Sequence, residues 1–273
     1  MRKTFFVFSL IILLSKSFLS QADTFHVLTP YVGPMTNKIT STTTKSEIKD
    51  HALLKGLYYQ QINPDLYQWN LFLYTCNDIN QSDLMGGHII VDRYFKKTDT
   101  GKFVIGVGMN SLDLSSSPIA VTNAVSISVA HTIYAPYVRT GYYFYFNQDS
   151  DLKLTLMPWF GFEEDIVRGY VQADIQLPFP GAPVITSRTS IDHNYEYGLG
   201  GLQFKINYHH FLDFKIKYHR KFSFDSKSEG LHNASAMINV YLSKNWGISY
   251  RYKYFEEITG SNSYNIFGVS YIF

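Results

Sequence analysis

The 273-residue chain has little cysteine, few charged side chains and, after its first residues, no long apolar run. Its one cysteine, Cys76, excludes a disulfide within the chain. A membrane-spanning helix needs about 20 consecutive apolar residues, and no segment after residue 22 provides them. The formal net charge of +2 is too small to indicate a nucleic acid or a strongly acidic partner. A disulfide scaffold and a helical membrane protein are therefore excluded.

Residues 1–22 are typical of a secretory signal peptide. A positively charged start precedes the apolar run Phe5–Leu14, which is too short to cross a bilayer as a helix. The small residues Ser20 and Ala22 then provide the expected cleavage site. We therefore expect export and a mature chain of one domain over 23–273.

Aromatic residues are abundant instead. The 22 Tyr and 21 Phe make the chain 17% aromatic, equal to its share of charged residues. Apolar and polar residues alternate along the C-terminal half, as in Ile248–Tyr254, which places an aromatic face opposite a polar face. Membrane β-barrels have this pattern because one face of each strand meets lipid and the other a wet interior. The sequence therefore predicts an all-β, closed transmembrane antiparallel β-barrel.

The alternation predicts fourteen strands, an even number that returns both chain ends to the periplasmic side. A barrel of twelve strands is the alternative, with 120–133 and 168–178 placed in extracellular loops. The fourteen expected strands are 24–34, 50–61, 67–79, 87–97, 102–112, 120–133, 137–147, 151–162, 168–178, 202–208, 212–219, 235–242, 248–254 and 263–273.

The last strand ends on an aromatic residue with no polar tail. Phe267, Val269, Tyr271 and Phe273 occupy every second position. This ending resembles the C-terminal signature of Gram-negative bacterial outer-membrane β-barrel proteins, without indicating a subfamily. The resemblance implies a location among outer-membrane lipids and recognition of the last strand by the barrel-assembly machinery.

Basic residues recur on the faces that should point into the barrel. Such a wall would attract anions, which predicts a small passive channel for anionic solutes. The alternative is a charge network that fills a narrow barrel, with Asp213, Glu196, Asp192 and Asp174 as the partners of the basic residues. The basic wall comprises Lys205, Lys215, Lys217, Lys221, Arg251 and Lys253.

Candidate catalytic and metal-binding groups are weak. His232 and Ser235 are three residues apart, so in a strand they face opposite sides, as do the adjacent Asp192 and His193. His209 lies beside a second histidine in an expected turn, without a third ligand for a metal. We therefore expect no enzyme, cofactor or metal, although an outer-membrane hydrolase stays open. A structural, binding or solitary autotransporter-like barrel is the other alternative to a channel.

The segment Gly198–Gly201 ("GLGG") lies inside a strand pattern, so it is not a phosphate-binding loop. It is interpreted as a bulge or a bend of the barrel wall.

Overall fold

The computed structural model describes residues 24–40, 47–79, 82–116, 118–122, 124–176, 183–209, 211–224, 230–257 and 260–273. The expected signal peptide lies outside these ranges, so it stays a prediction. None of the described residues forms a helix long and apolar enough to cross a membrane.

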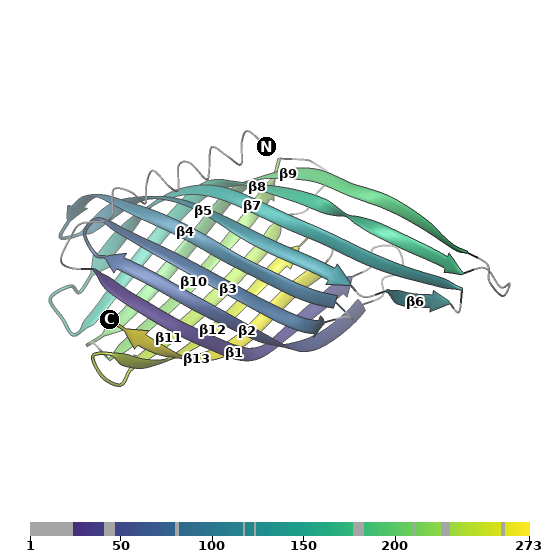
Figure 1. The fold of residues 1–273 in the computed structure, drawn as a ribbon. Helices are drawn as coiled ribbons and strands as arrows, with labels where there is room; N and C mark the ends of the chain where they lie inside the picture. The colour runs from purple at the N-terminus through teal and green to yellow at the C-terminus, as the bar shows by residue number, and fades with distance from the viewer. Residues whose placement is uncertain are drawn as a thin grey trace.

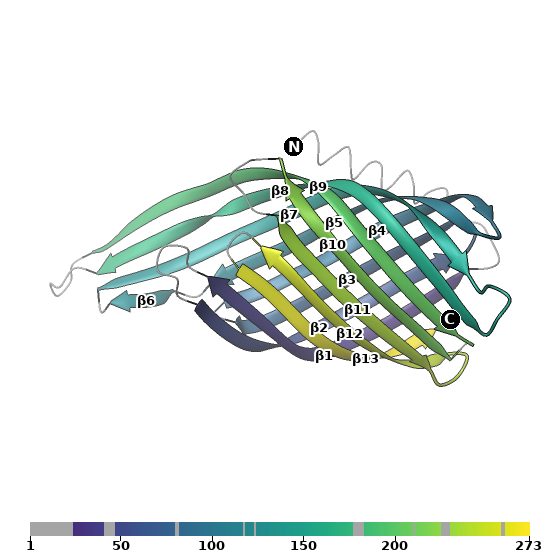
Figure 2. The same ribbon diagram turned by 180° about the vertical axis from the view of Figure 1, so that it is seen from behind.

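The described residues form thirteen strands in one antiparallel sheet, and all except the short β6 build a closed barrel of twelve strands (Figures 1 and 2). The order around the barrel is β5-β4-β3-β2-β1-β13-β12-β11-β10-β9-β8-β7, and β7 pairs back with β5. The strands are β1 Phe25–Thr40, β2 Glu47–Asn63, β3 Tyr67–Ile79, β4 Ser82–Thr98, β5 Gly101–Ser116, β6 Ile119–Thr122, β7 Val125–Phe146, β8 Leu152–Gln176, β9 Val184–Tyr208, β10 Leu212–Ser223, β11 Leu231–Tyr241, β12 Trp246–Glu257 and β13 Gly260–Ile272.

Alternation of side chains gives the barrel an apolar outside and a mixed inside. In β13, Phe267 is 57% exposed on the outer face, whereas Ile266 is fully buried on the inner face. Tyr218 of β10 and Trp246 of β12 are likewise exposed, and Trp246 lies beside a short turn, where aromatic rings mark the edge of a lipid bilayer. Lys55, which is also exposed, is a charged exception on the outer face.

The last strand closes the barrel on the first. The backbone amides of His26 and Phe273 each donate to the other residue's carbonyl oxygen at 3.0 Å. The Phe273 ring also stacks on the His26 ring, with centroids 5.2 Å apart. Because β13 is hydrogen-bonded to β1 as well as to β12, it has no free edge. The charged residues that protect a free edge from pairing with another chain are therefore not needed in this strand.

The prediction of fourteen strands is wrong. The barrel has the alternative count of twelve, but most of 120–133 and 168–178 lies in β7 and β8 and not in the loops that this alternative assumed. The expected strands 120–133 and 137–147 fall largely in one long strand, β7, and 151–162 and 168–178 fall in β8. Pro136 lacks an amide donor, so the β7–β8 ladder skips it, but the β5–β7 ladder continues through its pairing with Met109. A break in one ladder therefore did not end the strand.

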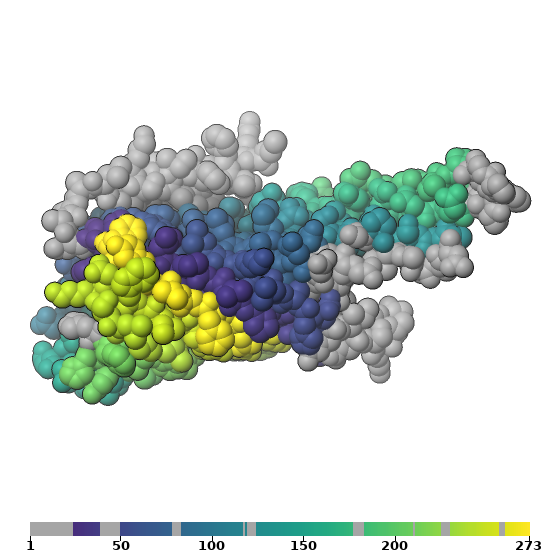
Figure 3. Space-filling view, turned by 60° about the horizontal axis from the view of Figure 1, so that its bottom comes forward, coloured from purple at the N-terminus to yellow at the C-terminus, as the bar shows by residue number. Residues whose placement is uncertain are grey.

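Three strands continue past the rim of the barrel as an extension that Figure 3 shows projecting from one end. We define the extension as 125–133 of β7, 167–176 of β8 and 184–193 of β9; at its base, 130–133 of β7 still pair with β5. The β9–β10 pairing stops at the Tyr197–Ser223 pair, whereas β8 and β9 stay paired as far as Gln176 and Val184. β6 pairs with the tip of β7.

Candidate functional site

The barrel encloses a cavity of about 770 Å³. Its lining includes eight lysine and arginine side chains against five aspartate and glutamate side chains, an excess of three positive charges. The excess arises because the polar faces of β10 and β12 carry lysine and arginine at alternate positions. The eight are Lys102, Arg139, Lys205, Lys215, Lys217, Lys221, Arg251 and Lys253, and the five are Asp92, Glu163, Asp165, Asp213 and Glu256.

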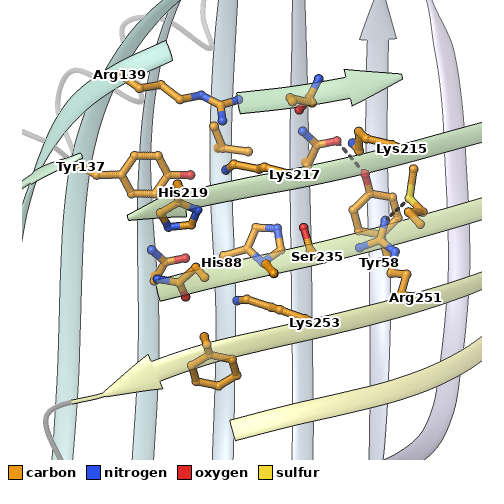
Figure 4. A pocket seen from close by; sticks show the side chains of 18 of the residues that line it. Tyr58, His88, Tyr137, Arg139, Lys215, Lys217, His219, Ser235, Arg251 and Lys253 are labelled. Atoms are coloured by element: carbon orange, nitrogen blue, oxygen red, sulfur yellow. Dashed lines mark hydrogen bonds between the residues drawn. The ribbon is translucent and has the colours of Figure 1, made fainter. Parts of the chain in front are cut away.

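All six residues of the basic wall line this cavity. Lys215 and Lys217 of β10 point into it together with Lys253 of β12, and His88 reaches in from β4 on the opposite wall (Figure 4). Among the described residues, no carboxylate lies within ion-pair distance of Lys215 or Lys217. The Lys217 ammonium lies 4.7 Å from the centroid of the Trp159 ring, which is a cation–π contact.

Two other members of the basic wall are paired with carboxylates. Lys205 Nζ lies 3.3 Å from Asp213 Oδ2, so one of the four expected acidic partners is found. Lys221 contacts Glu163 and lies 3.0 Å from Asp165 Oδ2, two carboxylates that the sequence analysis did not single out.

The other three expected acidic partners do not pair with the basic wall. Asp192 pairs with Arg168 on the outer face of the extension at 2.7 Å, and Asp174 accepts from Thr186 Oγ1 at 2.7 Å. Glu196 is exposed on the same face. A network of these three with the lysines is therefore contradicted.

Arg251 is enclosed by aromatic rings. Its guanidinium carbon lies 3.5 Å from the centroid of the Tyr58 ring and 5.1 Å from that of Tyr31, and its Nε donates to the Tyr31 hydroxyl at 2.9 Å. Phe72 lies on a third side, 5.8 Å from the guanidinium. These contacts fix the position of the Arg251 guanidinium. Its positive charge therefore acts on the lumen, but the side chain cannot move with a passing solute.

The sequence analysis missed a buried ion pair on the inner wall of the barrel. Arg139 of β7 and Asp92 of β4 are joined by Nη2 contacts of 3.0 and 2.7 Å and an Nε contact of 3.2 Å. Both residues fall within expected strands and on inward positions, so alternation could have assigned them to the lumen. Their pairing could not be assigned from alternation alone, because it depends on the registers of β4 and β7 with β5, which place Asp92 and Arg139 on either side of Gly106.

Gly201 of the GLGG segment provides space for an aromatic ring. A Cβ atom there would lie 2.5 Å from Trp159 Cε2. The register of β9 with β8 and β10 runs through this segment without a shift, so the interpretation as a bulge is wrong. Glycine is needed because the Trp159 ring lies close to the backbone at Gly201, beside Lys217 and 5.3 Å from the His219 ring centroid.

The candidate hydrolase groups do not converge. Ser235 lines the cavity, whereas His232, on the outer face, is bonded through Nδ1 to the Tyr218 hydroxyl at 2.6 Å. His193 lines the cavity, and its neighbour Asp192 is paired with Arg168 outside. Within the described ranges, no three His, Cys, Asp or Glu side chains are placed to hold a metal ion.

No protein-family model and no curated protein matches the sequence. Among solved structures, the chain is similar to the translocator domain of the autotransporter NalP from Neisseria meningitidis, with 13% identity, a TM-score of 0.59, and 95% of this chain and 92% of that chain covered. The Pseudomonas putida toluene transporter TodX (9% identity, TM-score 0.44, coverage 92% and 90%) and the KdgM porin (9%, 0.40, 88% and 98%) are less similar. The NalP comparison establishes the fold alone. It confirms the closed antiparallel β-barrel that the sequence predicts.

Proposed function

We propose that this protein is an outer-membrane barrel that acts as a small passive channel and favours anionic solutes. The observation that carries the proposal is the formal excess of three positive charges along the cavity, with no described carboxylate within ion-pair distance of Lys215 or Lys217. In a narrow passage with low-dielectric walls, such an excess raises the local concentration of anions. Passage needs no bond to be made or broken, so we propose no enzymatic activity.

The location rests on the outer surface and the last strand. Exposed aromatic and aliphatic side chains cover the outer face, and Phe267, Val269, Tyr271 and Phe273 are all exposed there. These features fit a barrel in outer-membrane lipids, exported with the help of residues 1–22 and assembled through recognition of β13.

A non-conducting barrel with a structural or binding role is the second candidate. The enclosed Arg251 and the Arg139–Asp92 pair favour it, because both place large, fixed side chains in the lumen. The two candidates differ in whether ions cross the bilayer through the protein.

Reversal potential in a salt gradient tests the proposal. We expect the wild-type protein to favour the anion, and Lys215→Glu combined with Lys217→Glu to move the potential toward cation preference. Lys96→Glu with Lys244→Glu is the matched control, because it changes the net charge equally at exposed positions in or beside turns at one end of the barrel. Equal selectivity of the wild type and the lumen variant would contradict the proposal.

A further inference from the structure

Three inward side chains of β10, β11 and β12 form one row across the barrel wall. Lys217 pairs with Ser235 in the β10–β11 ladder, and Ser235 pairs with Lys253 in the β11–β12 ladder. Neighbouring strands lie about 4.8 Å apart, so the Cα atoms of the two lysines are about 10 Å apart. The side chain between them is the short hydroxymethyl group of Ser235. All three residues line the cavity, and both lysines point into the lumen on either side of the serine (Figure 4).

The next inward row carries neutral hydrogen-bond donors. Trp159 of β8 pairs with Gly201 of β9, and the row continues through His219 to Asn233 of β11. Trp159 Nε1 and Asn233 Nδ2 are buried and have no hydrogen-bond partner among the described residues. Both side chains line the cavity, and the Trp159 ring lies 4.7 Å from the Lys217 ammonium. A buried donor without a partner is unfavourable, so an acceptor held between the two rows would stabilise this wall.

The described carboxylates of the cavity are bound elsewhere. Each of them contacts a partner that lies outside the two rows. No described carboxylate lies within ion-pair distance of Lys217, so a negative charge at Lys217 has to come from a ligand. The contacts are Asp92 with Arg139, Asp213 with Lys205, Glu163 and Asp165 with Lys221, and Glu256 with the His232 amide and the Tyr254 hydroxyl.

From this arrangement we infer that the wall around Ser235 is a binding site for a tetrahedral oxyanion with two negative charges, of the sulfate and phosphate class. The oxygen atoms of such an ion point in different directions, so it accepts from the ammonium groups and from the neutral donors at the same time. A planar oxyanion with one charge satisfies fewer of them. The inference deepens the proposed function by naming a ligand of the lumen, and it rests on the entry of anions that this function assumes.

The test compares two oxyanions that carry no proton at neutral pH. Sodium sulfate and sodium nitrate are titrated at constant ionic strength, in a chloride-free buffer, against the full-length mature barrel in detergent micelles. Binding is measured by isothermal titration calorimetry. We expect sulfate to bind at least about tenfold more tightly than nitrate, because the second charge adds a charge-assisted hydrogen bond to a second ammonium group.

A first variant removes the charges of the site. Lys217→Gln with Lys253→Gln should weaken sulfate binding at least about tenfold. The matched control is Lys96→Gln with Lys244→Gln, which removes two exposed lysines in or beside turns at one end of the barrel. This control should bind sulfate as the wild type does, because neither lysine lines the cavity.

A second variant separates a built site from general attraction by positive charge. Asn233→Ala removes the unpartnered amide donor without changing any charge and should weaken sulfate binding about fivefold. The matched control is Asn239→Ala on the same strand, where the amide oxygen already accepts from Ser249 Oγ at 2.6 Å. It should leave sulfate binding unchanged. Heat-modifiable migration on gels verifies that each variant is folded.

The possible failures are distinct. Equal affinity of the wild type for sulfate and nitrate would overturn the inference, and anion-selective conductance of the same protein would leave the proposed function standing. Sulfate binding that survives Lys217→Gln with Lys253→Gln, or that is unaffected by Asn233→Ala, would also overturn the inference. Sulfate binding by a barrel that passes no current would contradict the proposed channel and support the site.

Discussion

Removal of the Asp92 charge should destabilise the barrel more than any single exposed charge. Asp92 and Arg139 are 3% and 6% exposed, and Asp92 accepts three hydrogen bonds from the guanidinium. Asp92→Asn would leave the guanidinium buried without a counter-charge. Breaking a buried pair in this way costs about 3–5 kcal/mol. We expect a loss of this size in the free energy of unfolding.

The assay is denaturant unfolding in detergent micelles, followed by the loss of heat-modifiable gel migration. Asp65→Asn is the matched control, because Asp65 pairs with Lys97 where their side chains are 65% and 52% exposed. An exposed pair contributes only about 0–1 kcal/mol, so this variant should unfold almost as the wild type does.

A companion variant isolates the charge from the packing. Asp92→Leu with Arg139→Met removes both charges and should recover most of the lost stability, because no unpaired ion is then left in the lumen. Equal losses for Asp92→Asn and Asp65→Asn would refute the reasoning. They would mean that water reaches Arg139 and screens it.

Two further predictions concern packing and assembly. Gly201→Val should destabilise the barrel by about 1–3 kcal/mol in the same unfolding assay, because a Cβ atom would lie 2.5 Å from the Trp159 ring. Gly200→Val on the outer face is the control and should be tolerated. Equal losses of stability for the two variants would contradict the packing argument. Phe273→Ala should cost about 1–3 kcal/mol in detergent, since the ring is 57% exposed, but should reduce outer-membrane yield in cells far more than refolding yield. A parallel fall in both yields would make Phe273 only a packing residue.

Alternation along the chain was enough to predict a barrel, but not the number of its strands. A regular period of two continues through a strand that leaves the membrane, as in β7 and β8, so alternation cannot tell one long strand from two short ones. The acidic residues Glu163 and Asp165 lie between the expected strands 151–162 and 168–178, so the sequence assigned them to a loop. In the structure they face inward in β8 and contact Lys221 of β10.

The six residues of the basic wall line the cavity, since inward positions follow from the same alternation. What each cation contacts could not be predicted. Arg251 meets Tyr58 and Tyr31 only after β12 and β1 are brought together by closure through β13. Lys215 and Lys217 have no ion-pair partner among the described residues. Asp213 pairs with Lys205, and the acidic residues on β8 and β9 lie at the height of Lys221 or on the outer face.

A single-channel recording tests the central claim most directly. Purified wild-type protein is refolded, its folded state is verified by heat-modifiable migration, and it is inserted into a planar bilayer. We predict discrete conductance steps, and smaller steps for Lys215→Glu with Lys217→Glu when the anion carries most of the current. Folded, inserted protein that gives no current above the bare bilayer would contradict the account, because the lumen would then be filled and not a passage.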